Sequence, residues 1–260
     1  MLAQQRHKHI LDMLKRNGTV NTSDLVQKMN VSSETIRKDL DALEHSGQLK
    51  RVHGGAVAVP SESEVAPSIG YVSLETRNTQ HMNEKAAIAA YAASMIKENQ
   101  VIALDYGSTS FVMAKELAKR FQSLTIITNS VQNALALVNC PDFTIILVGG
   151  ILNKKELSLG NDFSPLLNNL HIDTLFMSVS GIHPKVGLTD QSFSEARVQN
   201  QMREMASKTI VLADSDKFGR ASLVKLCGLQ DVTSIITDSG IDPEIQMQIC
   251  DAGVNLIVVD

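Results

Sequence analysis

Apolar residues recur at helical spacing in three short stretches of the first 45 residues. Each stretch places its apolar side chains on one helix face: Ile10, Leu11 and Leu14; Leu25, Val26 and Met29; and Ile36, Leu40 and Leu43. Residues 18–21 break the pattern after the first stretch. Residues 30–32 form a tight turn before the third, with Val31 in the angle between two helices. The pattern therefore predicts three helices.

The third helix has two different faces. Ser32 precedes it and is placed to cap its N-terminus, while Ile36 and Leu40 point inward. The opposite face holds polar and cationic residues near the helix start: Ser33, Glu34, Thr35, Arg37 and Lys38. This end of the recognition helix enters the major groove in helix-turn-helix proteins. The arrangement predicts binding to double-stranded DNA.

A strand-like alternation follows the third helix. Residues 48–52 alternate, residues 53–55 form a glycine-rich turn and residues 56–59 resume an apolar run, which predicts a β-hairpin wing. Four residues of this wing are expected to approach phosphates or a minor groove: Lys50, Arg51, His53 and Gly54. The alternative is a solvated helix face and an ordinary Gly-Gly turn. The order of helices, turn and wing favours DNA binding.

The charge distribution supports this interpretation better than the total charge does. Residues 1–59 hold nine Lys and Arg against six Asp and Glu, a net charge of +3. Because the whole chain carries −4, the remainder carries −7. Four of the seven histidines also lie in the first 59 residues. The positive field is therefore local to the part of the chain with the helix-turn-helix pattern.

Residues 6–57 resemble the winged helix-turn-helix of the DeoR family of bacterial transcriptional regulators. The matching positions lie in the first helix, the recognition helix and the wing: Arg6, Ile10, Leu14, Ser32, residues 35–40 and residues 49–56. The resemblance implies that five of these residues belong to the family's DNA-reading surface: Thr35, Arg37, Lys38, Arg51 and His53. We assign residues 1–59 to a DNA-binding domain.

A polar stretch flanked by prolines at residues 60–67 indicates a linker, and we place its end at residue 76. Helices and strands then alternate: helices near 83–98, 110–121, 131–138, 193–207 and after Pro243, and strands at 101–105, 125–128, 143–148, 174–179, 209–213, 234–237 and 256–259. Continuous β-branched runs separated by helices predict an α/β domain at residues 77–260. Its sheet is expected to be buried and mostly parallel, with helices on both faces.

Ligands of such sheets bind outside the carboxyl ends of the strands. The residues after these strands are rich in glycine and polar side chains: residues 105–109, 129–130, 149–150, 180–181 and 214–219. Gly107, Ser108 and Thr109 open a helix, where free N–H groups and two hydroxyls suit a phosphate. Alternatively, Ser108 or Thr109 caps its own helix. Lys217 favours the anion site because it adds a counter-charge at the same sheet edge.

No dinucleotide-binding or P-loop fingerprint is present, which disfavours nucleotides. Residues 77–238 instead resemble the DeoR-family sensor domain, which is related in fold to ribose-5-phosphate isomerase and the CoA transferases. The site residues taken from strand ends and from this resemblance are Arg77, Lys85, Asp105, Gly107, Ser108, Thr109, Asn129, Ser130, Gly149, Gly150 and Lys217. The resemblance implies a homo-oligomeric repressor of a sugar or carbohydrate catabolic operon, which reads two half-sites. A phosphorylated sugar is expected to release it from DNA.

Two other functions remain open. An enzyme related to sugar-phosphate isomerases could use four residues for proton transfer: Asp105, Asp190, Glu195 and Lys217. Their spacing does not distinguish proton transfer from ligand binding, and fold alone does not give function. A DNA-binding protein without a ligand would leave the glycine-rich strand ends unexplained. We therefore expect a non-enzymatic regulator.

The cysteines and the hydrophobic runs add little. Cys140, Cys227 and Cys250 are widely spaced and lack a C-x-x-C motif, so we expect buried reduced thiols and neither a metal site nor a cofactor. The longest apolar run, residues 86–96, is too short to span a bilayer, and the polar N-terminus does not resemble a signal peptide. A cytoplasmic protein is expected.

Overall fold

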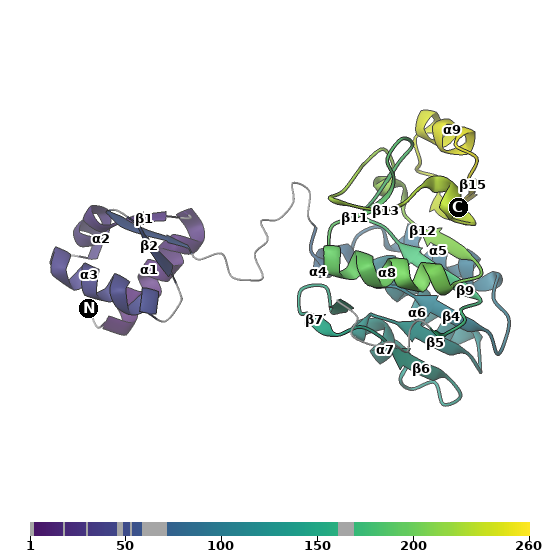
Figure 1. Ribbon diagram of the computed structural model, residues 1–260, viewed down its shortest axis with the longest axis horizontal. Helices are drawn as coiled ribbons and strands as arrows, with labels where there is room; N and C mark the ends of the chain where they lie inside the picture. Colours follow the sequence, from purple (N-terminus) through teal and green to yellow (C-terminus); the bar gives the residue numbers. More distant parts are fainter. Residues whose placement is uncertain are drawn as a thin grey trace. The chain divides into compact units, whose positions relative to one another are not determined.

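The computed structural model describes residues 3–17, 19–29, 31–45, 49–52, 54–58, 72–160 and 169–260. The chain divides into two compact units, residues 1–67 and 68–260. The predicted helices and wing appear in the first unit: α1 (Ala3–Asn17), β1 (Thr19–Asn21), α2 (Thr22–Met29), α3 (Ser33–His45), β2 (Leu49–Val52) and β3 (Gly55–Ala58). These helices and strands can be followed in Figure 1.

Strand β1 was not predicted, because the sequence pattern treats residues 18–21 only as a break. It pairs antiparallel with β3, which also pairs with β2, in the order β1-β3-β2. A Cβ atom on Gly55 would lie 2.0 Å from the backbone oxygen of Val20, so only glycine permits this close pairing. The wing is thereby joined to the helices through backbone contacts.

The core of the first unit contains the apolar stripes of the sequence. Five of its side chains are completely buried or nearly so: Ile10, Leu25, Ile36, Leu40 and Leu49. Val31 packs against this cluster as the turn pattern predicts. Truncating such a side chain to alanine generally costs about 2–5 kcal/mol. The inner face of α3 therefore fixes this helix in the core of the first unit.

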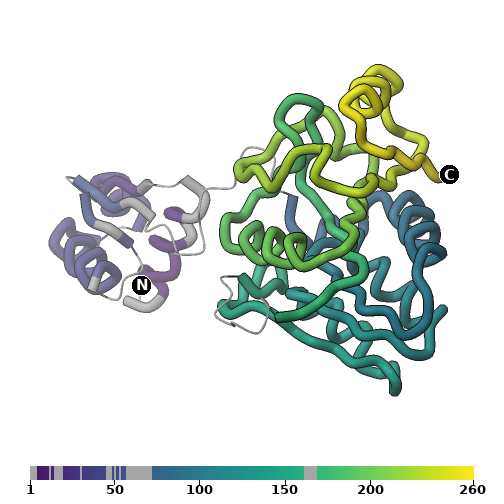
Figure 2. The backbone as a smooth tube through the Cα atoms, turned by 45° about the vertical axis from the view of Figure 1, so that its right-hand side comes forward, coloured from purple at the N-terminus to yellow at the C-terminus, as the bar shows by residue number. Residues whose placement is uncertain are grey.

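The second unit is built on a seven-stranded sheet in which all neighbouring strands are parallel. The strand order is β15 (Asn255–Val259), β14 (Ser234–Asp238), β12 (Thr209–Leu212), β9 (Thr174–Ser178), β4 (Val101–Leu104), β5 (Thr125–Thr128) and β6 (Thr144–Leu147). The predicted α/β class and parallel sheet are confirmed. Figure 2 shows the yellow C-terminal segment and the teal strands near β6 at opposite ends of this unit.

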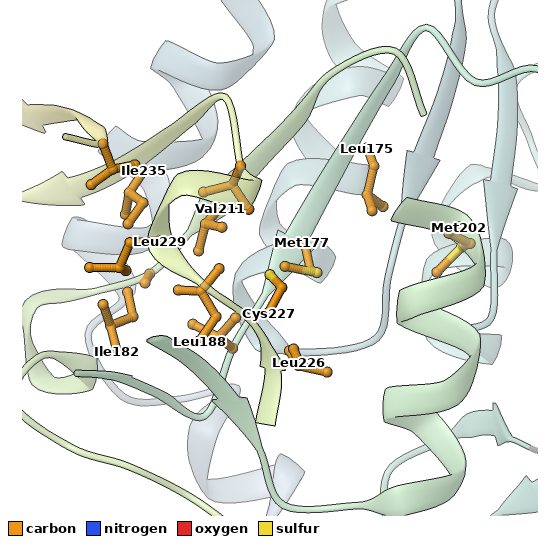
Figure 3. Close-up of a cluster of buried hydrophobic side chains, with 14 of the residues drawn as sticks. Leu175, Met177, Ile182, Leu188, Met202, Val211, Leu226, Cys227, Leu229 and Ile235 are labelled. Carbon is orange, nitrogen blue, oxygen red and sulfur yellow. The ribbon is translucent and has the colours of Figure 1, made fainter. Parts of the chain in front are cut away.

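Each face of the sheet is covered differently. Helices α5 (Met82–Ser94), α6 (Ser108–Arg120) and α7 (Val131–Leu137) cover one face. The other carries α8 (Phe193–Met205), α9 (Pro243–Asp251) and an antiparallel sheet of β10 (Gly181–His183), β11 (Gly187–Asp190) and β13 (Val224–Cys227). Figure 3 shows the buried side chains of this second face, with Leu188 and Leu226 among them and Met202 reaching in from α8.

Several short elements were missed by the sequence analysis. They are α4 (Leu74–Arg77), the hairpin of β7 (Ile151–Asn153) and β8 (Ser158–Gly160), the three strands of the antiparallel sheet, and two single-turn 3-10 helices at Ser215–Lys217 and Leu229–Asp231. Each has only three or four residues, too few to show a hydrophobic period. The first three residues of α4 also lie within residues 60–76, which the sequence predicts to be linker, and Arg77 lies just beyond them.

The strand order reverses between β4 and β9. Strands β4, β5 and β6 proceed toward one edge, and β9, β12, β14 and β15 toward the other. In open α/β sheets the crevice at this reversal, outside the carboxyl ends of the strands, is the usual ligand position. The loop after β4, residues 105–107, lies at the reversal. The loop after β12, residues 213–217, lies two strands away on the same edge.

Candidate functional site

The N-terminus of α3 is capped as the sequence predicts. The Ser32 hydroxyl accepts a hydrogen bond from the Thr35 N–H at 3.2 Å and lies 2.8 Å from the Thr35 hydroxyl. The predicted reading residues Ser33, Glu34, Arg37 and Lys38 are exposed, whereas Thr35 is half-buried. The first turns of α3 thus expose two cationic side chains, Arg37 and Lys38, to solvent.

Asp39 on the inner side of α3 was not predicted to have a role. Its carboxylate accepts hydrogen bonds from Arg6 Nε at 2.6 Å and Nη2 at 3.0 Å, and His7 Nε2 lies 3.1 Å away. Burial alone would raise the pKa of Asp39, but hydrogen bonds from Arg6 and His7 outweigh burial and leave it below its ordinary value. Because Arg6 and His7 belong to α1, this cluster fixes the orientation of the recognition helix.

The wing residues are placed less favourably than predicted. The guanidinium of Arg51 pairs with Asp41 of α3, and its backbone N–H donates to Glu44 at 2.8 Å. A DNA contact by Arg51 would therefore have to compete with Asp41. Gly54 is exposed in the left-handed region at φ 87°, as a tight wing tip requires. His53 and the side chain of Lys50 lie outside the described part of the chain.

The N-terminus of α6 has no side-chain cap. Its N-cap is Gly107 at φ 134°, with no side-chain hydrogen bond to the first turn. Ser108 and Thr109 occupy the first two helical positions and are almost completely buried. The alternative in which one of them caps α6 is therefore wrong. The first N–H groups of a helix lack intrahelical partners, so this end can accept an anion.

The turn between α4 and α5 contacts the loops after β4 and β12. On one side, the Asn78 amide donates to Gln132 at 3.2 Å, and the Gln132 amide lies 3.5 Å from the Gly107 carbonyl oxygen. On the other, His81 Nε2 lies 2.9 Å from a carboxylate oxygen of Asp216, next to Lys217. Sequence reasoning missed Asn78, His81 and Gln132, because they belong to no periodic pattern.

Lys85 is a buried cation behind this turn. Its ammonium donates to the carbonyl oxygens of Arg77 at 2.5 Å and Gln80 at 2.6 Å, and only 2% of the residue is exposed. Burial lowers the pKa of Lys85; the charge of Asp214 opposes the shift, and those of Lys217 and Arg77 add to it. Lys85 therefore lies within electrostatic reach of the loop after β12.

Asp214 is the other buried charge near Lys85. The residue is 2% exposed, and its Oδ1 has no hydrogen-bond partner in the structure. Asp214 and Lys217, which follow β12, both act electrostatically on the buried ammonium of Lys85. Lys217 is half-buried at the end of its 3-10 turn, with its backbone N–H bonded to the Asp214 carbonyl at 3.0 Å.

Arg77 is already engaged by the protein. Its guanidinium pairs with the buried carboxylate of Glu156 in the turn of the β7–β8 hairpin. Its Nε also donates to the Val72 carbonyl at 3.0 Å. The predicted contact between Arg77 and an effector would require sharing the guanidinium with Glu156. Arg77 joins α4 to the hairpin, and its carbonyl oxygen holds Lys85.

Asp105 is completely buried at the end of β4. Its carboxylate accepts hydrogen bonds from the Ser110 hydroxyl at 2.5 Å, the Gln199 amide at 2.7 Å and the Ser178 N–H at 2.7 Å. Burial raises the pKa of Asp105 to about 8, even though these donors oppose the shift. The residue connects β4 with β9 and α8 and does not face solvent.

The predicted residues after β5 and β6 lie against the β7–β8 hairpin. Asn129 donates from its amide to the Leu159 carbonyl at 3.1 Å, and its own Oδ1 is buried without a partner. The Ser130 hydroxyl caps α7 by accepting from Asn133 N–H at 3.3 Å. A Cβ atom on Gly149 would lie 2.5 Å from the Leu159 side chain, so close packing explains why position 149 is glycine.

Two hollows in the described part of the chain are lined by other residues, and Gly107 lines neither of them. The larger, of about 660 Å³, adjoins α4 and the hairpin turn and is lined by Ser73, Leu74, Glu75, Asn78, Lys154, Lys155 and Leu157. Of these lining residues, Asn78 also bonds to Gln132, which in turn lies against the Gly107 carbonyl in the loop after β4. The groups at the carboxyl ends of β4 and β12 carry more weight than this hollow, because they lie near the reversal of the strand order, which is the usual ligand position in open α/β sheets.

Comparison with known proteins bears on both units. Residues 6–62 match the family model described as the DeoR-like helix-turn-helix domain, and residues 80–239 match the DeoR C terminal sensor domain. The second match alone spans more than half of the chain. The chain belongs to the DeoR family of transcriptional regulators. DNA binding and transcription regulation follow from this membership, and the resemblance of both parts is confirmed.

DeoR-family relatives match over almost the full length. The transcriptional regulator GolR of Listeria innocua serovar 6a is 34% identical, with 100% of both chains covered. The Escherichia coli K12 protein named glycerol-3-phosphate regulon repressor is 30% identical, covering 96% of this chain and all of that one. Ribose 5-phosphate isomerase A from Methanocaldococcus jannaschii gives a distant structural likeness of 17% identity and TM-score 0.39, over 52% and 53% of the two chains.

The acidic set considered for an enzyme is buried in this DeoR-family protein. Asp190 accepts hydrogen bonds from the Tyr106 hydroxyl at 2.8 Å and the Ser180 hydroxyl at 3.1 Å. Glu195 accepts from Ser158 at 2.8 Å, Asn153 at 2.9 Å and the hydroxyls of Ser192 and Ser194. Each carboxylate therefore has protein donors, an arrangement typical of structural networks. The relatives described above are named as regulators or repressors.

The remaining predictions concern cysteines, metals and membranes. Cys227 is buried as predicted, but Cys140 is only half-buried and Cys250 is exposed, because it lies on the outer side of α9. Among the residues that the structure describes, no group of three or more His, Cys, Asp or Glu is arranged to hold a metal ion. The described helices include none that is long and apolar enough to cross a membrane.

Proposed function

We propose that this regulator senses an anionic small molecule, a phosphorylated sugar or polyol, at the carboxyl edge of the parallel sheet. Effector binding there releases the protein from its operator. The observation that carries the proposal is the uncapped N-terminus of α6 behind Gly107, with the cationic Lys217 two strands away on the same edge. Helix N-termini bind phosphates through free N–H groups and the helix dipole.

The effector contacts divide into direct and supporting groups. Direct contacts are proposed for Gly107, Ser108, Thr109 and Lys217, with Asn129 Oδ1 as a buried acceptor for a hydroxyl. The other residues of the predicted set support the site through protein contacts: Arg77, Lys85, Asp105, Ser130, Gly149 and Gly150. This division follows from which polar atoms already have protein partners.

Names of relatives support a role in carbohydrate metabolism. The putative aga operon transcriptional repressor of Escherichia coli O157:H7 is 32% identical over 98% of this chain, and the K12 relative is named for glycerol 3-phosphate. One relative, from Haemophilus influenzae, is named an L-fucose operon activator. We propose a repressor of a carbohydrate operon, because two of these three names describe repressors.

For DNA, we propose that the first turns of α3 enter the major groove of an operator half-site. The contacts are assigned to Ser33, Glu34, Thr35, Arg37 and Lys38, with Lys50, His53 and Gly54 contributed by the wing. Arg51 contributes only if it exchanges Asp41 for a phosphate. A homo-oligomer presents two such surfaces to two half-sites.

A thermal-shift panel tests the effector class directly. Phosphorylated sugars and polyols are compared with the same compounds without phosphate and with inorganic phosphate. A ligand that binds only the folded protein raises its melting temperature by mass action. We expect a shift from a phosphorylated compound that its neutral counterpart does not give. If the neutral compounds shift the melting temperature equally, the anion site is wrong.

A further inference from the structure

Among the described strands, β6 forms one edge of the parallel sheet. It pairs with β5 on one side and with no described strand on the other. Its sequence is Thr-Ile-Ile-Leu, without charge or proline. Natural proteins usually protect exposed edges with lysine, proline, bulges or covering segments, because an open edge pairs with another strand. An uncharged apolar edge is therefore able to pair with another strand.

The backbone directions define which groups are available. Thr144 N–H donates to the Leu124 carbonyl at 3.0 Å and Val148 N–H donates to the Thr128 carbonyl at 2.8 Å, so these even-numbered positions face β5. Successive residues of a strand present their backbone groups to opposite sides. The N–H and C=O groups of Ile145 and Leu147 therefore point away from the sheet.

These outward groups match a second copy of the same strand. In an antiparallel pair, two residues exchange both hydrogen bonds, and the next pair along exchanges none. Pairing Ile145 of one copy with Leu147 of the other uses all four outward groups of each strand. Ile146 then faces Ile146 across a twofold axis as the pair without hydrogen bonds. The positions of the outward backbone groups therefore fix the register of the pairing.

The side chains around β6 fit the same arrangement. Ile145 packs into the core that α7 covers and Ile146 into the core of the opposite face, so Leu147 lies on the α7 side. Leu147 is 46% exposed, Leu135 of α7 is 66% exposed, and Val138, the C-cap residue that follows α7, is 63% exposed. Residues three or four positions apart on a helix lie on the same face, so Leu135 and Val138 point to the same side. A twofold neighbour would cover apolar side chains next to the paired strands.

We propose that β6 pairs antiparallel with β6 of a second copy, which joins two sheets into one continuous sheet across a twofold axis. A second copy is favoured because the edge is self-complementary and carries no charge that would select a different partner. Reading two half-sites also requires two copies of α3. The proposal goes beyond the proposed function, and its tests use neither DNA nor effector.

Cysteine cross-linking tests the register. In a chain with Cys140 and Cys250 replaced by serine, Ile146→Cys should give a disulfide-linked dimer on mild oxidation, reversed by reductant. Residues opposite each other without hydrogen bonds have Cα atoms about 4.5 Å apart, within the range of a disulfide. Ile145→Cys and Leu147→Cys alone should not cross-link, because their identical partners lie about 7–8 Å away on the diagonal. A mixture of these two variants should cross-link.

A charge substitution tests the interface itself. Leu147→Lys should halve the native mass measured by light scattering, because each copy then adds a lysine beside the central Ile146 pair and the two like charges repel across the interface. Val258→Lys, a half-exposed aliphatic residue of the opposite edge strand β15, is the matched control and should keep the wild-type mass. Far-UV circular dichroism checks that both variants fold.

A wild-type mass for Leu147→Lys, a monomeric wild-type protein, or cross-linking of Ile146→Cys no faster than of a Val258→Cys control would overturn the proposal. These outcomes leave the effector proposal untouched, because the thermal-shift panel measures ligand binding whether or not the copies associate.

Discussion

Helices α3 and α6 begin in opposite ways. At α3 the Ser32 hydroxyl satisfies a first-turn N–H, and the charged residues that follow are exposed. At α6 the cap is glycine, no side chain satisfies the first turn, and Ser108 and Thr109 are buried. A capped helix end presents side chains to its partner, whereas an uncapped one presents backbone N–H groups. A capped end such as that of α3 suits contact with a DNA groove, and an uncapped end such as that of α6 suits binding of a small anion.

The largest expected effect is at α6. Replacing Ser108 and Thr109 together with alanine should remove two hydrogen bonds to a charged ligand, a loss of about 3–6 kcal/mol in effector binding. The variant should still bind operator but no longer release it when effector is added, because effector acts only through differential binding. Lys217→Ala should behave likewise. Fluorescence anisotropy with labelled operator measures both affinities.

Thermal stability supplies the control for these variants. Because neither hydroxyl caps α6, their loss should change the melting temperature little. If the variants melt earlier yet respond to effector at wild-type concentrations, the two residues are scaffold and the contrast with α3 fails.

At α3, Arg37→Ala should weaken operator binding by about 1–3 kcal/mol while effector affinity and melting temperature stay unchanged. Arg37 is exposed on the face opposite the core, so its loss removes no packing. A base contact would relax specificity at one position, whereas a phosphate contact would flatten the salt dependence by about one unit. Lys119→Ala, an exposed cation of α6, is the control. Unchanged operator affinity for Arg37→Ala would remove α3 as the reading helix.

The pH dependence of stability tests the network beneath α6. Burial raises the pKa of Asp105 to about 8, so the folded protein keeps a proton that the unfolded chain has released. The free energy of unfolding should fall as pH rises between about 4 and 8, by up to about 1.4 kcal/mol per unit, and level off above.

Asp105→Asn should reduce this slope, because an amide has no proton to lose. The amide can still accept from Ser178 and donate to the Ser110 hydroxyl, so the fold is retained. The pKa of the buried Asp190 is also raised by burial, which leaves part of the slope. Denaturant unfolding at several pH values gives the comparison. Identical slopes for both proteins would show that Asp105 is ionised in the fold.

The smallest effect is expected at the α3 cap. Ser32→Ala should cost about 1 kcal/mol of stability in the DNA-binding unit and weaken operator binding only to that extent. Ser32→Asp, which keeps a capping oxygen, should restore the stability. If Ser32→Ala leaves the stability unchanged yet weakens operator binding, the hydroxyl acts on DNA and does not cap the helix.

Long periodic elements were predictable from the sequence, and short connecting elements were not. Strand β5 was predicted at its observed residues, because Thr125 to Thr128 form an isolated β-branched run between polar segments. The β7–β8 hairpin has three residues in each strand and pairs through backbone groups that leave no sequence period. Tertiary context produces these elements, so local pattern cannot find them.

The candidate site was predictable only where residue type reveals chemistry. Gly107 and Lys217 follow strands, and the sheet brings their loops to one edge. Asn78 and His81 were missed because their roles arise from the turn between α4 and α5, which lies just after the expected linker and carries no periodic pattern. For Arg51 the residue type did not reveal the ion pair with Asp41, because that partner lies ten positions away in the sequence and is visible only after folding.

The rate at which Lys85 reacts with an acylating reagent offers a measure of opening at this site. A lysine reacts with acylating reagents only as an exposed, deprotonated amine, and Lys85 is held against two carbonyl oxygens with 2% of the residue exposed. It should therefore be labelled far more slowly than Lys119, whose side chain is 72% exposed. Its labelling rate reports how often the turn between α4 and α5 opens. A bound anion that draws this turn closed would slow the reaction further.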